Sequence, residues 1–200
     1  MTTDPETIGV YDAQSKDYAA LTRKEANDPE LVAFIARLPQ KAHVLDLGCG
    51  PGHCAAAMIS AGMVVDAVDA SREMVKLAHK ARVPARIARF SDIDENAVYD
   101  GIWASFSLLH APRDEFPGLL NALYKATKPN GLLFLGMKLG EGESRDAIGR
   151  FYSYYSEEEL RDYLTDAGFS GLQTSVGSGK GLAGDTSDFI KIACRKPTDA

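Results

Sequence analysis

An acidic residue followed by three closely spaced glycines is the segment of this chain best suited to bind a ligand. Residues 44–52 read VLDLGCGPG. Apolar residues typical of a buried strand lead into a turn whose glycines let a ligand approach the backbone and leave the N–H groups of the next helix accessible. The carboxylate of Asp46 at this turn disfavours a phosphate and favours a cation. The segment therefore predicts a binding site for a ligand that carries positive charge.

A second acid ends the next apolar segment, VDAVDAS at residues 65–71. The carboxylate of Asp69 is placed to accept hydrogen bonds from both hydroxyls of a ribose, as an acid after a glycine turn does in nucleotide sites. Its rival, Asp66, lies inside the segment and alternates to another face. We therefore predict that Asp69 binds a ribose.

Residues 44–52 resemble, almost letter for letter, the first motif of the Rossmann-like (class I) S-adenosylmethionine-dependent methyltransferases. With later landmarks, the resemblance covers roughly residues 12–195. It implies that the cofactor is S-adenosylmethionine, that the product is S-adenosylhomocysteine, and that a methyl group passes directly, in line, to a small molecule. No catalytic residue follows from it, because an activated cofactor makes a general base optional.

The resemblance also implies which residues contact the cofactor. Asp46 favours its ammonium end or, alternatively, fixes the turn. Met74 packs near adenine or serves ordinary helix packing, and Asp94 competes with Asp92 for the adenine edge. Either Ser105 or Phe106 offers a backbone carbonyl to the ammonium group. The full cofactor set is Tyr18, Asp46, Gly48, Cys49, Gly50, Asp69, Ala70, Met74, Asp92, Ile93, Ser105 and Phe106.

Three further residues are candidates for the substrate side. His110 follows the fourth-strand landmark YDGIWASFSLL, and its ordinary pKa suits a proton acceptor, although it can instead shape the loop through hydrogen bonds. Tyr152 and Tyr155 belong to an aromatic cluster that either lines an apolar pocket or anchors a loop on the sheet. We expect a shaping role for His110.

Composition narrows the function classes. The net charge of −6 and the scattered basic residues argue against nucleic acid as a partner. Apolar runs are too short to span a membrane, and the N-terminus lacks a signal pattern, so we expect a cytoplasmic protein, monomer or homodimer. Three cysteines are too few for a disulfide framework, and no second cluster completes a metal site near Cys49, so we expect no metal.

The elements that must position these residues alternate between strand and helix, which indicates an α/β fold. We predict one methyltransferase domain over residues 1–200: a doubly wound, seven-stranded, mostly parallel sheet with helices on both faces. Its last two strands form a hairpin, so the last strand is antiparallel. A dehydrogenase would instead continue with helical crossovers.

Residues 1–40 should form a helical N-terminal cover, and residues 139–155 a substrate-side insertion. Expected helices include 12–23, 28–37, 52–60, 72–80, 114–127 and 156–168. Expected strands are 43–47, 63–69, 86–89, 99–105, 132–138, 169–176 and 188–194. We predict a turn at residues 129–131 and a flexible hairpin connection at residues 177–181, which read GSGKG.

Two other functions remain open from the sequence. A protein that binds S-adenosylmethionine or S-adenosylhomocysteine as a sensor or accessory subunit would carry the same motifs without turnover. A nucleotide-dependent oxidoreductase is disfavoured by the acid before the glycines and by the closing strand pair.

Overall fold

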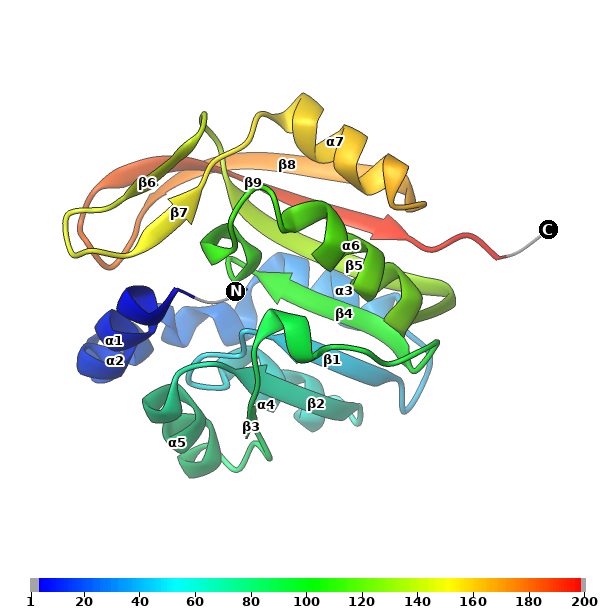
Figure 1. Ribbon diagram of the computed structural model, residues 1–200. Helices are drawn as coiled ribbons and strands as arrows, with labels where there is room; N and C mark the ends of the chain where they lie inside the picture. The colour runs from blue at the N-terminus through cyan, green and yellow to red at the C-terminus, as the bar shows by residue number, and fades with distance from the viewer. Residues whose placement is uncertain (1–3, 199–200) are drawn as a thin grey trace.

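A seven-stranded sheet forms the centre of the protein, whose computed structural model describes residues 4–198 (Figure 1). Its strands are β1 (His43–Leu47), β2 (Val64–Asp69), β3 (Arg86–Ile87), β4 (Tyr99–Ser105), β5 (Thr127–Lys138), β8 (Ser170–Lys180) and β9 (Thr186–Arg195). Their order is β3-β2-β1-β4-β5-β9-β8. Strand β9 runs antiparallel to both of its neighbours, β5 and β8, whereas the pairs among β1 to β5 are parallel. The predicted sheet is confirmed, although β3 is shorter than expected.

Helices cover both faces of the sheet, as predicted. On one face lie α3 (Pro29–Ala36), α4 (His53–Ser60) and α5 (Arg72–Lys80), and on the other α6 (Phe116–Ala126) and α7 (Glu157–Asp166). A hydrophobic core lies on each face of the sheet, because successive side chains of a strand point to opposite faces. In β4, Trp103 packs on the face of α3, α4 and α5, whereas Ile102 and Ala104 pack on the face of α6 and α7. Both faces of the parallel strands are therefore buried.

Side-chain caps fix the beginnings of several helices. The Asp28 carboxylate accepts a hydrogen bond from the Glu30 N–H at 2.8 Å, and the Ser71 hydroxyl accepts one from the Met74 N–H at 3.1 Å. Ser156 begins α7 with a capping box. These caps satisfy N–H groups that have no partner inside the helix, and they match the helix starts that the sequence indicates.

The N-terminal cover differs from the single helix expected over residues 12–23. It contains α1 (Pro5–Ala13), α2 (Ser15–Thr22) and the 3-10 helix η1 (Arg23–Asn27). Helix α1 begins earlier because the Asp4 carboxylate accepts from the Thr7 N–H at 2.9 Å and Pro5 occupies the first turn. In Figure 1, α1 and α2 lie beyond the carboxyl ends of the parallel strands.

Two loop predictions in the second half of the chain were wrong. Residues 177–180 are part of β8 and pair with β9 as far as Lys180 and Thr186. The ring of Phe189 covers Gly177 so closely that a Cβ there would lie 2.6 Å from it, so glycine serves strand packing at this position. Residues 129–131 lie within β5, where Asn130 takes a φ of 62° and the register with β4 shifts.

Residues 139–155 contain a small hairpin of β6 (Glu143–Arg145) and β7 (Phe151–Ser153), separate from the main sheet. Short 3-10 helices, η2 (Phe90–Asp92) and η3 (Leu108–His110), follow β3 and β4. No helix within residues 4–198 is both long enough and apolar enough to cross a membrane.

Candidate functional site

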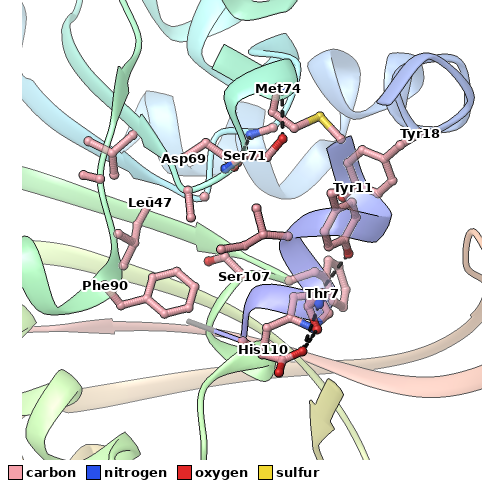
Figure 2. A pocket seen from close by; sticks show the side chains of 18 residues that line it. Thr7, Tyr11, Tyr18, Leu47, Asp69, Ser71, Met74, Phe90, Ser107 and His110 are labelled. Carbon is pink, nitrogen blue, oxygen red and sulfur yellow. Dashed lines mark hydrogen bonds between the residues drawn. The ribbon is translucent and has the colours of Figure 1, made fainter. Parts of the chain in front are cut away.

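A cavity of about 640 Å³, including its open mouth, lies at the carboxyl ends of β1, β2 and β4, against α1 and α2 (Figure 2). We call it the main cavity. Most of its wall is apolar. It is lined by Asp4, Thr7, Ile8, Tyr11, Tyr18, Leu47, Gly48, Gly50, Val68, Asp69, Ala70, Ser71, Met74, Ala88, Phe90, Phe106, Ser107 and His110. Eight of the residues singled out in the sequence are therefore brought together here: Tyr18, Gly48, Gly50, Asp69, Ala70, Met74, Phe106 and His110.

A second, smaller hollow of about 340 Å³, including its open mouth, adjoins the first. We call it the side pocket. It shares Tyr18, Gly48 and Gly50 with the main cavity, so one extended ligand can reach both. Its lining also includes Thr22, Glu25, Asp46, Cys49, Pro51, His53, Cys54, Trp103 and Ser105. Asp46, Cys49 and Ser105, expected near the cofactor, thus lie in the side pocket.

The glycine turn between β1 and α4 separates the two hollows, and its backbone requires glycine. Gly48, Gly50 and Gly52 all have positive φ, at 77°, 52° and 83°. A Cβ on Gly48 would lie only 2.4 Å from the Cβ of Ser107, and one on Gly52 would lie 3.0 Å from that of Ala78. The glycines therefore bring the turn close to the loop after β4 and to α5.

Asp69 ties this turn to the end of β2. Its carboxylate accepts hydrogen bonds from the Gly50 N–H and from the Ser71 N–H, each at 2.8 Å. Burial raises the pKa of Asp69 to about 6, while these hydrogen bonds lower it. Figure 2 shows the side chain at the main cavity beside Ser71 and Met74.

The side pocket is acidic. Asp46 is almost fully buried, and its Oδ2 has no hydrogen-bond partner. Burial, followed by the charges of Asp69 and Glu25, raises the pKa of Asp46 to about 8. Burial and the neighbouring Asp28 raise the pKa of Glu25 to about 7. Among the described residues that line the two hollows there is no lysine or arginine, so the electrostatics favour a cationic group.

The loop after β4 forms another part of the wall of both hollows. Phe106 adopts a positive φ of 55°, and its N–H donates to the Gly136 carbonyl at 3.0 Å. This sharp turn places Ser105 in the side pocket and Ser107 in the main cavity. The buried Ser107 hydroxyl has no hydrogen-bond partner.

His110, at the end of this loop, is held by two hydrogen bonds. Its Nδ1 donates to the Phe151 carbonyl at 2.6 Å, so its Nε2 accepts from the Tyr11 hydroxyl at 2.9 Å (Figure 2). Arg150 in turn donates to the Tyr11 oxygen at 3.0 Å. Burial lowers the pKa of His110 to about 4, so the ring is neutral near pH 7.

Helix α1 bridges the two sides of the main cavity. Toward α5, the Asp12 carboxylate accepts hydrogen bonds from the Ser71 hydroxyl at 2.5 Å and from the Glu73 N–H at 3.1 Å. Toward the β6–β7 hairpin, Thr7 Oγ1 accepts from the Phe151 N–H at 2.8 Å. Asp4 also accepts two hydrogen bonds from the Arg145 guanidinium, at 2.8 and 2.9 Å. The helix is therefore fastened at both ends.

Two residues expected at the adenine edge lie outside the linings of both hollows. The exposed Asp92 carboxylate accepts from the Arg89 N–H at 2.9 Å within η2, and the Ile93 side chain is buried in the core. Neither lines the main cavity or the side pocket. Phe90 lines the main cavity in this region instead.

The two substrate-side tyrosines are also buried outside both linings. Tyr152 packs behind His110, with ring centroids 4.6 Å apart, and Tyr155 packs against Phe116 at 4.8 Å. Of the two interpretations open from the sequence, this placement matches the anchoring of a loop on the sheet.

Several lining residues were not found from the sequence, namely Asp4, Thr7, Ile8, Glu25, Phe90 and Ser107. The pair Asp4-Pro5 is a helix-start signal of the same kind as Asp28-Pro29, so α1 could have been found from it. No local signal marks Glu25, whose placement depends on how η1 packs against α4.

Comparisons with solved structures agree with this fold. The 1,6-didemethyltoxoflavin-N1-methyltransferase of Burkholderia thailandensis superposes with a TM-score of 0.77 at 24% identity, covering 97% of this chain and 88% of that one. A protein of Thermotoga maritima described as a possible histamine N-methyltransferase superposes with a TM-score of 0.70 at 18% identity, covering 94% and 99%.

Sequence relatives match over a shorter stretch. The chain is 36% identical over 98 residues to the cypemycin N-terminal methyltransferase of Streptomyces sp., covering 46% of this chain and 40% of the relative. It is 30% identical over 102 residues to a ubiquinone biosynthesis O-methyltransferase of Xanthomonas oryzae, covering 47% and 42%. The match thus spans less than half of each relative. The profile of the methyltransferase domain matches residues 18–174, and the chain belongs to this family.

Proposed function

We propose that the protein is an S-adenosylmethionine-dependent methyltransferase that transfers a methyl group directly to a small molecule. One observation carries the proposal: the glycine turn lies between a cavity that contains Asp69 and an acidic pocket that contains Asp46. A ribose fits the first carboxylate and an ammonium group fits the second. The partnerless, buried Oδ2 of Asp46 supports a cationic donor at that place.

The residues of this chain suit each part of the cofactor. Asp69 would accept from the ribose hydroxyls, and Ala70 and Met74, with Phe90, would pack against adenine. Gly48 and Gly50 would lie beside the chain that joins ribose to the amino acid, and Asp46 and the loop at Ser105 would meet its ammonium group. When bound, the cofactor supplies a methyl group on a cationic sulfur.

The chain's own contribution to transfer would be positioning and exclusion of water. Helix α1 covers the main cavity, and the neutral His110 is held between Tyr11 and the Phe151 carbonyl. With both ring nitrogens engaged, His110 would shape the cavity rather than accept a proton, which is the role that we predict for it. Alignment of two bound reactants can by itself supply a large part of a rate enhancement.

The names of similar proteins support a small-molecule acceptor. The Burkholderia structure contains 1,6-didemethyltoxoflavin and S-adenosylhomocysteine, and the Xanthomonas relative is named for ubiquinone biosynthesis. The mostly apolar lining of the main cavity suits a small organic acceptor.

Isothermal titration calorimetry tests the cofactor. S-adenosylmethionine and S-adenosylhomocysteine should bind, whereas NAD and ATP should not, and tighter binding of NAD would contradict the proposal. A panel of metabolites, screened for release of S-adenosylhomocysteine, then tests turnover. Cofactor binding without turnover on any acceptor would favour a sensor or accessory protein.

A further inference from the structure

We propose that Glu25, on the 3-10 helix η1, binds the ammonium group of the cofactor's amino-acid tail together with Asp46. The inference rests on the proposed function and adds a second carboxylate, from the N-terminal cover, to a site where the sequence predicts one carboxylate, that of Asp46. The side pocket would then be completed only when η1 is packed in place.

The position of Glu25 supports this role. Its backbone carbonyl accepts from the Asp28 N–H at 3.0 Å and contacts the Cys54 sulfur of α4 at 3.9 Å, so its backbone is fixed against the helix that follows the glycine turn. Glu25 and Asp46 line the same pocket from different elements. Tyr18 and Gly50 connect this pocket to the main cavity, where Asp69 lies.

The charges around the pocket point to a cationic ligand. Asp46 Oδ2 is a buried acceptor without a donor, an arrangement that costs stability unless a ligand supplies the donor. The nearby Lys191 is outside the pocket lining, and its ammonium group binds Asp28 at 2.7 Å. A primary ammonium has three N–H donors, so a single group can serve both Glu25 and Asp46.

A pair of ligands tests the role of Glu25 by calorimetry. S-adenosylhomocysteine carries the ammonium group, and 5′-methylthioadenosine shares its adenine and ribose but lacks the amino-acid tail. In Glu25→Gln, affinity for S-adenosylhomocysteine should fall about ten- to hundredfold, because a charged hydrogen-bond partner is lost. Affinity for 5′-methylthioadenosine should stay within about twofold of the parent.

Glu30→Gln is the matched control, because Glu30 is the next glutamate in the chain and its carboxylate binds Ser175 outside the side pocket. This variant should bind both ligands like the parent. Glu25→Asp, which keeps the charge, should bind S-adenosylhomocysteine more tightly than Glu25→Gln and guards against loss through misfolding alone.

Two results would overturn the inference: equal weakening of both ligands in Glu25→Gln, or unchanged affinity for S-adenosylhomocysteine in a folded variant. A parent protein that fails to bind S-adenosylhomocysteine would instead overturn the proposed function itself, so the two failures are distinguishable.

Discussion

At the residue scale, Asp69 both fixes the glycine turn and lines the main cavity. Its carboxylate accepts hydrogen bonds from the Gly50 and Ser71 N–H groups, and it also lines the main cavity. In the proposed complex, a ribose would therefore meet a carboxylate whose position the backbone fixes in advance. Such preorganisation lowers the entropy lost on binding.

Replacing Asp69 by Asn should weaken binding of S-adenosylhomocysteine about 10- to 100-fold, since a charged acceptor typically contributes about 1.5–3 kcal/mol. Calorimetry measures the affinity, and Asp66→Asn is the control because Asp66 bonds Tyr99 and Arg86 away from the cavity. An unchanged dissociation constant in folded Asp69→Asn would show that another acid binds the ribose.

His110→Ala tests whether this ring is structural or chemical. The substitution removes two hydrogen bonds and opens a hole, which should destabilise the protein by about 2–4 kcal/mol and lower the melting temperature by roughly 5–15 °C. Affinity for S-adenosylhomocysteine should fall in parallel, and turnover no further than these changes explain. A variant that melts and binds like the parent but turns over about 100-fold more slowly would make His110 a base.

At the scale of elements, α1 is the part of the molecule that closes the site. Its contacts with α5 and with the β6–β7 hairpin are made by polar side chains at its ends, and α1 is amphipathic only weakly. Tertiary hydrogen bonds therefore hold α1 in place more than burial of an apolar stripe does.

Asp12→Ala should loosen α1 selectively. Loss of the bonds to Ser71 and Glu73 should speed hydrogen exchange at the α1 amides about 5- to 30-fold, equivalent to roughly 1–2 kcal/mol, and leave exchange in β1 and β4 unchanged. Asp17→Ala, at an exposed position of α2, is the control. Equal acceleration throughout the sheet would contradict a local effect.

The elements also show what a sequence can and cannot specify. Strands such as β1 and β4 were predictable because apolar periodicity and the glycine motif are local signals. The expected helix over residues 12–23 corresponds to α2, whereas apolar periodicity does not indicate α1. Glycines usually mark turns, so the sequence predicts a loop where β8 ends. Only the ring of Phe189, far along the chain, explains Gly177. Glu25 lines its pocket through a similar long-range contact, between η1 and α4.

For the whole molecule, the buried acids make stability depend on pH. In the folded protein the pKa of Asp46 is raised to about 8 and that of Glu25 to about 7, from 3.8 and 4.5. The folded state thus holds protons that the unfolded chain releases. The resulting stability is full below the unfolded pKa values and is lost as pH rises through 7 and 8.

The melting temperature of the ligand-free protein should therefore fall between pH 6.5 and 8.5. Asp46→Asn, which cannot ionise, should flatten this decline, whereas Asp17→Asn should not. Differential scanning calorimetry in buffers of low ionisation enthalpy gives the comparison. The pKa of His110 is lowered to about 4, so its contribution has the opposite sign: stability should rise with pH between about 4 and 6.5. A melting temperature that rises between pH 6.5 and 8.5 would contradict this account.

The short length of α1 has a consequence for the rate at which ligands exchange. A nine-residue helix is not stable alone in water, so it cannot swing open as a rigid flap once its bonds to α5 and the hairpin break. Opening of the main cavity is then a local folding equilibrium of residues 4–13. Urea at concentrations too low to unfold the sheet should accordingly speed the release of S-adenosylhomocysteine. Local unfolding of α1 would then set the rate at which the product leaves.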